Sequence, residues 1–241
     1  MWPVLLDWQG TIIYAYPLFI GLSWGLGYRL GEAAKPQDMT RTQYSLWVLG
    51  LFISSWIGAK LLFVLTQDRW ATGDLVRAAN FWLGGGFVFL GGLLGGGLYS
   101  LILATLFPQF NSKRMSFLLV PLLWAHAVGR MGCFLAGCCY GTESHVPWAV
   151  EMHGAHRHPT QLYEAFGLAL LAWLLKTKRL SAHRLPAYLV GYGVLRWIVE
   201  CFRGDELRGA WWGQSTSQWI ALAMLLAGLG LYTRLQVLKK T

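Results

Sequence analysis

Apolar runs, each about as long as a membrane-spanning helix, follow one another along almost the whole chain. Such a helix needs roughly 20 consecutive apolar residues. Short polar stretches separate seven runs, which we place at 11–30, 45–66, 84–107, 115–136, 160–176, 186–202 and 215–236. The pattern predicts an all-α polytopic membrane protein with seven transmembrane helices in a single domain, residues 1–241.

Two polar segments change this simple picture. The fourth run is the least regular, because we expect the glycine-rich stretch 129–141 to interrupt it. Irregular backbone at membrane depth is tolerated only where protein or a watery cavity covers it, so the interruption indicates a site. The longest loop, 137–159, is rich in histidine, and the loop 67–83 has the pattern of an amphipathic surface segment.

Composition supports a membrane protein. Hydrophobic residues make up 55% of the 241 residues and charged residues only 13%, whereas a soluble domain has about 25% charged residues. The net charge of +9 lies mainly in the loops, so we expect attraction to anionic lipids and no nucleic acid partner. Residues Met1 to Gly10 contain no Lys or Arg, which argues against a cleavable signal peptide.

The distribution of Lys and Arg predicts the orientation of the chain. With the N-terminus outside, twelve of these residues fall in the inner segments, five in the outer segments and three within the spans. Inner loops carry the excess of positive charge in multi-pass proteins. The count therefore predicts an N-out, C-in topology.

Arg130 and Arg196 are the strongest candidates for function. An arginine at the centre of a bilayer costs at least ~2.5–3.5 kcal/mol on insertion scales, so it needs a partner or a role. One alternative is a purely structural ion pair, since Glu200 lies four residues after Arg196 and on the same helical face. Tyr192 extends that polar stripe by one turn, and His126 precedes Arg130 by the same spacing.

These residue types suit a phosphodiester. A guanidinium can donate two hydrogen bonds to two phosphate oxygens, and it keeps its charge. Glycines would let backbone N–H groups approach the same anion, and the candidates are Gly129, Gly132, Gly137 and Gly141. If the phosphate leaves in a reaction, the same groups stabilise the charge that develops on it.

Four stretches in order resemble the prolipoprotein diacylglyceryl transferases of the bacterial inner membrane. They are GRMGCFLAGCCYG at 129–141, HPTQLYEA at 158–165, YGVLR at 192–196 with Glu200 and Arg203, and GQ at 213–214 with Ser217. Weaker similarity extends the resemblance over residues 13–225. The resemblance implies seven helices with the N-terminus outside, in agreement with the charge count.

The resemblance also implies a reaction. The diacylglyceryl group of phosphatidylglycerol passes to the thiol of a lipobox cysteine in a preprolipoprotein, which forms a thioether and releases glycerol 1-phosphate. Arg130 and Arg196 would hold the phosphate, and Tyr16 and Glu200 match other catalytic positions. The implied substrate-binding residues are Gly129, Gly132, Gly141, Tyr192, Arg203 and Gln161. No cofactor or metal is implied.

Three residues depart from the family pattern. Cys133 stands where the signature has Asn, Cys138 stands where it has Glu, and Leu90 replaces a histidine of the third span. That histidine is a natural acceptor for the thiol proton, a role leucine cannot take. We therefore consider His126, or a histidine of the loop 137–159, as the substitute base.

Several alternatives stay open. Four roles are open for the three cysteines Cys133, Cys138 and Cys139. They could be packing residues, reactive thiols activated by Arg130, ligands of a metal or iron–sulfur site, or part of a disulfide. Their C-x4-C-C spacing matches no common metal motif. The glycine run at 84–97 indicates tight helix packing or a lipid groove. Functional rivals are a paralogue with another acceptor, a non-catalytic phospholipid-binding or translocating protein, and a membrane metal or redox protein.

Overall fold

A computed structural model describes residues 3–8, 11–65, 89–107, 110, 115–177, 180, 183–204 and 210–238. The chain divides into two compact units, of which the larger contains Met1–Ala34 and Ser116–Thr241 and the smaller contains Lys35–Met115. Within the described residues there are seven α-helices and three short β-hairpins. The helical class predicted from the apolar runs is therefore confirmed, with the hairpins as an addition.

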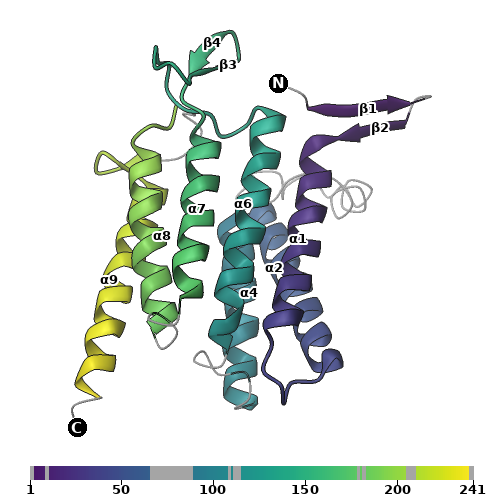
Figure 1. The fold of residues 1–241 in the computed structure, drawn as a ribbon, viewed down its shortest axis with the longest axis vertical. Coiled ribbons are helices and arrows are strands. Elements are labelled where there is room, and N and C mark those ends of the chain that lie inside the picture. The colour runs from purple at the N-terminus through teal and green to yellow at the C-terminus, as the bar shows by residue number, and fades with distance from the viewer. Residues whose placement is uncertain are drawn as a thin grey trace. The chain divides into compact units, whose positions relative to one another are not determined.

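The larger unit has five helices that pack in sequence order. They are α1 (Ala15–Ala34), α6 (Leu119–Ala136), α7 (Thr160–Lys176), α8 (Arg184–Glu200) and α9 (Thr216–Val237). Each helix contacts the next, so α6 lies between α1 and α7, and α8 lies between α7 and α9 (Figure 1). A 3-10 helix, η3 (Ser116–Leu118), leads into α6. This order brings α6, α7 and α8, the helices with the candidate polar residues, side by side.

Local sequence explains where these helices begin and end. Pro159 stands at the N-cap of α7, where its missing N–H leaves no helix hydrogen bond unmade. At the start of α9, Ser215 and Gln218 form a reciprocal capping box. Helix α6 ends at Gly137, whose left-handed φ of 74° is a conformation that glycine adopts without steric cost.

The observed boundaries differ from the predicted spans in two places. Residues 11–14 form strand β2 instead of the start of the first helix, because they pair with β1. Helix α6 continues through Gly129 and Gly132 to Ala136, so the predicted interruption of the fourth span is wrong before Gly137. Tertiary packing outweighs the weak helix propensity of glycine here, since Gly132 lies against Phe19 of α1. Residues 67–83 and 84–88 lie outside the described part of the chain.

Three antiparallel hairpins connect or precede the helices of the larger unit. They are β1 (Val4–Trp8) with β2 (Thr11–Tyr14), β3 (Val150–Met152) with β4 (Ala155–Arg157), and β5 (Ala210–Trp211) with β6 (Gln214–Ser215). The second hairpin lies within the loop 137–159, beyond the ends of α6 and α7 (Figure 1). That loop is therefore structured by its own backbone hydrogen bonds.

The smaller unit contains α2 (Arg41–Leu65) and α4 (Phe89–Leu106), which pack closely against each other. A Cβ atom on Gly58 would collide with the backbone of Gly91, and one on Gly95 would collide with Ser54. Small residues that let two backbones approach are typical of helix pairs in membranes. For these glycines, tight packing is the alternative that the structure supports.

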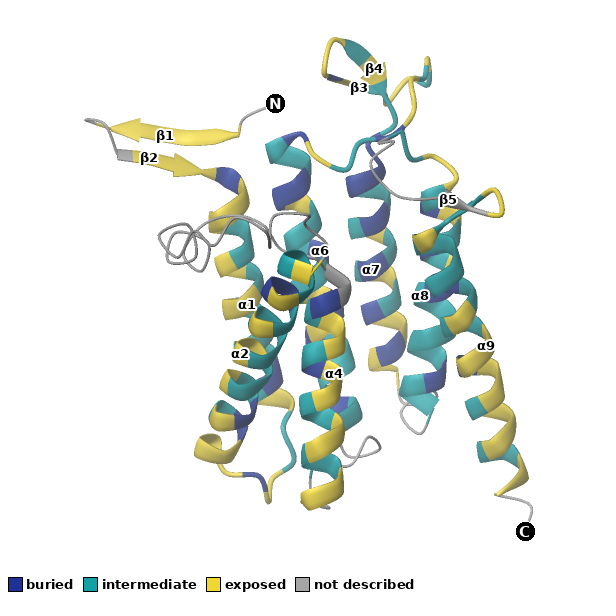
Figure 2. Ribbon diagram, turned by 180° about the vertical axis from the view of Figure 1, so that it is seen from behind, coloured by how far each residue is buried: buried dark blue, intermediate teal, exposed yellow. Residues whose placement is uncertain are grey.

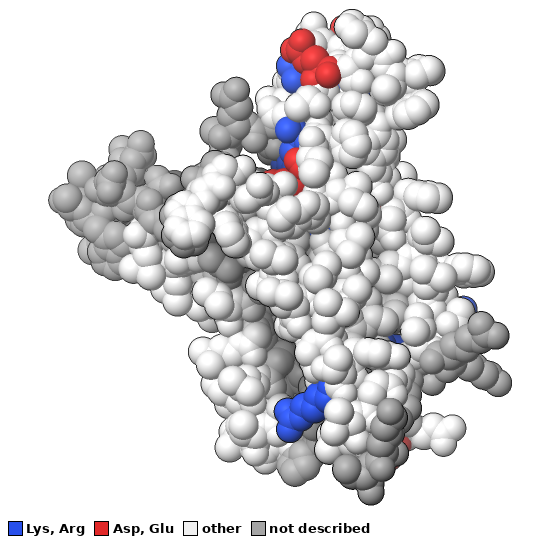
Figure 3. All heavy atoms as spheres, turned by 90° about the vertical axis from the view of Figure 1, so that its left-hand side faces the viewer, with Lys and Arg blue, Asp and Glu red and all other residues white. Residues whose placement is uncertain are grey.

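The surface of the helices is that of a membrane protein. Three helical segments among the described residues are long and apolar enough to cross a bilayer: Arg41–Leu65, Ser116–Ala136 and Thr216–Val237. Exposed positions, yellow in Figure 2, include Leu22, Leu49, Phe166 and Trp173, each more than 50% exposed. Figure 3 shows a face on which most described atoms belong to uncharged residues. Water does not favour such a surface, whereas lipid does.

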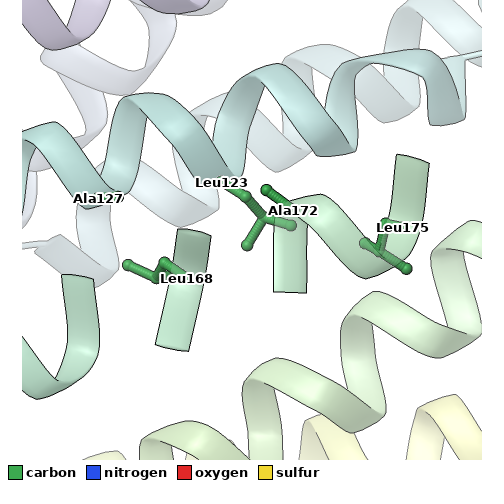
Figure 4. Packing of buried hydrophobic residues seen from close by; sticks show 5 residues of the cluster. All are labelled: Leu123, Ala127, Leu168, Ala172 and Leu175. Atoms are coloured by element: carbon green, nitrogen blue, oxygen red, sulfur yellow. The ribbon is translucent and has the colours of Figure 1, made fainter. Parts of the chain in front are cut away.

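A small apolar core joins α6 to α7. Leu123 and Ala127 of α6 meet Leu168, Ala172 and Leu175 of α7, as the close view in Figure 4 shows. Leu168 and Ala172 are 0% exposed. Their four-residue spacing places them on the same face of α7 as Glu164, so this core fixes the face from which Glu164 projects.

Leu168→Ala is expected to lower the free energy of unfolding by about 2–5 kcal/mol, because it leaves a cavity between α6 and α7. Thermal unfolding of the purified protein in detergent measures the change. Leu170→Ala is the matched control, since the same residue type two positions along α7 is 46% exposed. Equal losses in the two variants would contradict the assigned core.

Candidate active site

A buried carboxylate, Glu164 of α7, lies at the centre of the polar cluster between α6, α7 and α8. Its side chain is 1% exposed. Arg130 Nη2 donates to Glu164 Oε1 at 2.8 Å, and Arg196 Nη1 donates to Glu164 Oε2 at 3.2 Å. The Tyr192 hydroxyl donates to Oε1 at 3.1 Å. One carboxylate thus brings together the two arginines that the sequence singled out.

A second carboxylate, Glu200, holds the other side of the Arg196 guanidinium. Arg196 Nη2 donates to Glu200 Oε2, and it also lies 2.9 Å from the Ser217 hydroxyl oxygen. The Ser215 hydroxyl donates to Glu200 Oε1 at 2.8 Å, and Arg203 Nε lies 3.9 Å from Oε2. The four-residue ion pair expected between Arg196 and Glu200 is therefore present, but it is one part of a larger network.

Three guanidinium groups and two carboxylates of the described residues make up this network: Arg130, Arg196, Arg203, Glu164 and Glu200. Arg130 Nε is also a buried donor that has no hydrogen-bond partner among the described residues. Leaving such a donor unsatisfied costs free energy, so the cluster is suited to one additional anion.

His126 belongs to the same cluster. Its Nε2 atom lies 3.7 Å from Glu164 Oε1, and its ring centroid lies 5.6 Å from that of Tyr192. The distance of 3.7 Å is too long for a hydrogen bond. His126 precedes Arg130 by about one turn of α6. Leu90, which replaces the family's histidine, lies on α4 in the smaller unit. The role of His126 as a base stays a prediction.

The glycine N–H groups are not available for a phosphate. Gly129 and Gly132 lie inside α6, where their N–H groups belong to the helix ladder. The N–H of Gly137 bonds to Phe134 O at 3.1 Å, and that of Gly141 bonds to His158 O at 3.0 Å. The expectation that these amides contact the anion is wrong, because the backbone of α6 and its following turn already engages them. The guanidinium groups of Arg130 and Arg196 remain as the candidate donors to a phosphate.

Gly129 differs from the other glycines in its surroundings. A Cβ atom there would meet only Ser23 Oγ, at 3.8 Å, whereas one on Gly132 would lie 2.6 Å from Phe19 Cβ. Gly132 is thus required by packing against α1. At Gly129 a methyl group would fit without a collision, so packing does not require glycine there.

The residues that follow α6, 137–142, form the signature turn, and main-chain bonds tie this turn to the end of α8. Thr142 N–H donates to Phe202 O at 2.8 Å, and Gly204 N–H donates to Tyr140 O at 3.1 Å. A Cβ atom on Gly141 would lie 2.5 Å from His158 O, so only glycine fits at this crossing. The turn therefore holds Arg203 close to the end of α6.

Tyr16 and Gln161 lie around the signature turn rather than on the arginines. Gln161 is 1% exposed, and its Nε2 atom donates to Cys138 O at 2.7 Å. Tyr16, in the first turn of α1, is 44% exposed and has its carbonyl oxygen beside Gly132. Of the loop histidines, His153 Nε2 lies 2.6 Å from Gly137 O, so this histidine supports the turn.

The three cysteines of the signature come together in space. The sulfur atoms of Cys133, Cys138 and Cys139 all lie within 4.8 Å of one another. All four cysteines of the chain are described, and none is in a disulfide. Hydrogen bonds from the other two thiols lower the pKa of the Cys139 thiol, and the charges of Arg203 and Arg130 act in the same direction.

Sequence reasoning missed Glu164. It is the only acidic residue in the predicted span 160–176, and a carboxylate within a span is itself a sign of function. Its partners Arg130 and Arg196 are 34 and 32 residues away in the chain, so helical spacing could not reveal the contact. The lone acidic residue was the available signal.

Comparison with known proteins gives a consistent result. The family model described as prolipoprotein diacylglyceryl transferase matches residues 3–234. The phosphatidylglycerol–prolipoprotein diacylglyceryl transferase of Clostridium tetani is 32% identical over 95% of this chain and 96% of its own length. The protein of the same name from Bordetella parapertussis is 31% identical over 95% and 91%, and that of Haemophilus influenzae is 32% identical over 87% and 86%.

Glu164→Gln is expected to lower the free energy of unfolding by about 3–5 kcal/mol, because it leaves buried guanidinium groups without their counter-charge. An anionic lipid would then take the place of the carboxylate. Phosphatidylglycerol should therefore restore thermal stability in detergent better than phosphatidylcholine does.

Glu143→Gln is the control, since that carboxylate also pairs with an arginine but is 69% exposed. We expect a change of at most about 1 kcal/mol for an exposed pair. If both lipids protected Glu164→Gln equally, the cluster would not be an anion site.

Proposed function

Because the chain belongs to the prolipoprotein diacylglyceryl transferase family, we propose that it catalyses the reaction named in its relatives. The donor is phosphatidylglycerol and the acceptor is the lipobox cysteine of a preprolipoprotein. The sulfur of that cysteine forms a thioether with the diacylglyceryl group, and glycerol 1-phosphate is released. The chain is a membrane enzyme, and we place it in the bacterial inner membrane.

One observation carries the assignment of the donor site: Arg130 and Arg196 meet at Glu164, and Arg130 Nε is a buried donor with no hydrogen-bond partner among the described residues. A phosphodiester supplies one negative charge and two oxygens that accept hydrogen bonds. Arg130 Nε and the guanidinium edge beside it are suited to those oxygens. We therefore assign phosphate binding to the two arginines, with Tyr192, Glu200 and Arg203 holding them in position.

An apolar groove beside the cluster suits the donor's acyl chains. It lies between α7 and α8, has a volume of about 390 Å³, and includes Phe166, Leu195, Val199 and Phe202 in its lining. Val199 is next to Glu200 in the chain, and Phe202 is next to Arg203, so residues of the groove and of the cluster alternate along this segment. A phospholipid needs this combination of an apolar channel and a cationic end.

The same arginines serve the chemical step. As the thiolate attacks the glyceryl carbon, the bond from that carbon to the phosphate oxygen breaks and charge accumulates on the leaving phosphate. Fixed guanidinium groups in a site of low polarity stabilise such charge more than water does. His126 is the nearest histidine to the cluster, and we keep it as a candidate for accepting the thiol proton.

For the topology we propose one transmembrane domain with seven spans, the N-terminus outside and the C-terminus inside. The count of twelve inner against five outer cations supports it. In the larger unit, α1 begins and α6 ends at the same end as the hairpin β3–β4, whereas α9 ends at the opposite end (Figure 1). The signature turn and Arg203 would then face the outer side.

Cells depleted of their own transferase provide the test of function. We expect the full chain to restore lipidation of preprolipoprotein and growth. Arg130→Lys should lower transfer from labelled phosphatidylglycerol to a lipobox peptide by at least about tenfold, because lysine keeps the charge but lacks the planar fork and Nε. Arg29→Lys is the control, since Arg29 lies 3.1 Å from Glu32 in a surface pair and is 73% exposed.

Two results would contradict the proposal. If the purified protein bound phosphatidylglycerol but transferred nothing to lipobox peptides, it would be a phospholipid-binding protein or act on another acceptor. If Arg130→Lys and Arg29→Lys behaved alike, the arginine cluster would not be the donor site.

Fusions to a phosphatase that is active only outside the cytoplasm test the topology. A fusion after Ser144 should be active, because the loop 137–159 is placed outside. A fusion after Val237 should be inactive, because the C-terminus is placed inside. The reverse pattern would overturn the orientation.

A further inference from the structure

Three cysteine side chains gather at the end of α6. Cys133 lies in the last turn of the helix, and Cys138 and Cys139 lie in the signature turn that follows. Their sulfur atoms all lie within 4.8 Å of one another. Cys133 is buried, Cys139 is half-buried and Cys138 is exposed, so the cluster is open on one side.

The backbone of the signature turn is shaped to bring these thiols together. Gly137 has a φ of 74° and Cys139 has a φ of 62°. A left-handed conformation costs a residue other than glycine about 1 kcal/mol, so it persists only where the surroundings impose it. Two left-handed residues in three positions fold the chain back, which returns the thiols of Cys138 and Cys139 to Cys133.

Side chains from outside the turn hold this conformation. The carbonyl oxygens of residues 137, 138 and 139 each have a different side-chain partner. His153 Nε2 lies 2.6 Å from the first, Gln161 Nε2 donates to the second at 2.7 Å, and the Thr160 hydroxyl donates to the third at 2.9 Å. Supporting contacts of this kind, on three consecutive carbonyls, are typical of a site that holds its ligand groups ready.

Three thiolates are a donor set for a thiophilic cation. Divalent zinc binds sulfur at about 2.3 Å in a tetrahedral arrangement, and a site with three protein ligands leaves the fourth position open. The sulfur separations here fit such a site after small side-chain rotations. Packing alone does not account for an exposed Cys138 or for a cysteine at positive φ.

We propose that Cys133, Cys138 and Cys139 bind one thiophilic divalent cation of the zinc class, and that its open fourth position takes the thiol of the acceptor. This proposal rests on the proposed function, because it assigns the metal to the acceptor side of that reaction. It departs from the family resemblance, which implies no metal.

The step balances without an oxidant or a reductant. A thiol that coordinates such a metal is deprotonated, and its proton passes to water. The bound thiolate then attacks the glyceryl carbon. A carbon–sulfur bond forms as the bond from carbon to the phosphate oxygen breaks, and the electron pair of that bond stays on the released glycerol phosphate. The thioether product carries no charge, so it is a weaker ligand and leaves the metal.

The position of the cluster fits this role. Cys133 follows Arg130 by three residues on α6, which places the two side chains on neighbouring positions of one helical face. Arg203 pairs with Gly141 in an isolated β-bridge, which brings it to the signature turn. A donor phosphate at Arg130 and an acceptor thiol at the cysteines would therefore meet around the same turn. Coordination would also remove the need for the proton acceptor that Leu90 cannot provide.

Cobalt is the probe for the site, because thiolate ligands give Co²⁺ an intense charge-transfer absorption. We expect the full-length protein in detergent to bind one Co²⁺ per chain, and this absorption to rise when a lipobox peptide is added. The same peptide with serine in place of its cysteine should leave the spectrum unchanged. Cys138→Ser and Cys139→Ser should weaken binding by at least about 100-fold, more than the loss of a supporting residue does.

Cys201→Ser is the matched control. Cys201 is the fourth cysteine of the chain and lies at the end of α8, outside the cluster. Its variant should bind Co²⁺ like the unaltered protein. Protection of each variant by phosphatidylglycerol against thermal unfolding verifies that it is folded. Removal of the metal from the unaltered protein with a chelator tests the metal site without a substitution.

The outcomes separate this inference from the proposed function. Transfer to lipobox peptide should stop on chelation and return with Zn²⁺. Transfer that continues after chelation, equal Co²⁺ binding by Cys138→Ser, or a disulfide within the cluster would overturn the metal site and leave the transferase intact. One bound metal that senses the thiol peptide, with no transfer under any condition, would keep the site and overturn the function.

Discussion

The carboxylate of Glu164 connects three helices of the larger unit. Two guanidinium groups from α6 and α8 converge in an apolar bundle, and without a carboxylate between them they would repel each other at low polarity. Glu164 uses one oxygen for each arginine, so one side chain of α7 links α6 to α8. A buried network of this kind contributes little net stability compared with apolar packing. We therefore relate its presence to the anionic ligand proposed above.

The signature turn places the cysteine thiols near the charged cluster. Helix α6 carries Arg130 and Cys133 one turn apart, and main-chain bonds from the turn to Phe202 bring Arg203 to the same place. Arg130 and the three thiols thus lie on one continuous segment, the end of α6 and the turn that follows it. The proposed reaction joins a sulfur to a carbon next to a phosphate, and it requires the two groups at a fixed separation.

Features that depend on neighbouring residues could be predicted from the sequence, whereas features that depend on contacts between distant segments could not. The helix predicted at 160–176 matches α7, because Pro159 before it and the apolar run itself are local signals. Residues 11–14 were misassigned, since an apolar strand and the start of an apolar helix have the same composition and only pairing with β1 separates them. Glu164 escaped notice because its partners lie on other helices. The cysteine spacing gave no sign that Cys139 turns back to Cys133.

The proposed metal site would give the departures from the family pattern one physical explanation. The resemblance expects a histidine at the position of Leu90, and such a proton acceptor would be needed only while the acceptor sulfur still carries its proton. Cys133 and Cys138 add soft ligands beside Arg130, and a metal held there would deprotonate the incoming thiol directly. As separate packing changes, these substitutions would be unrelated, and an exposed Cys138 next to a strained Cys139 would have no cause. A single requirement, an acceptor in thiolate form, would account for the lost histidine and the gained cysteines together.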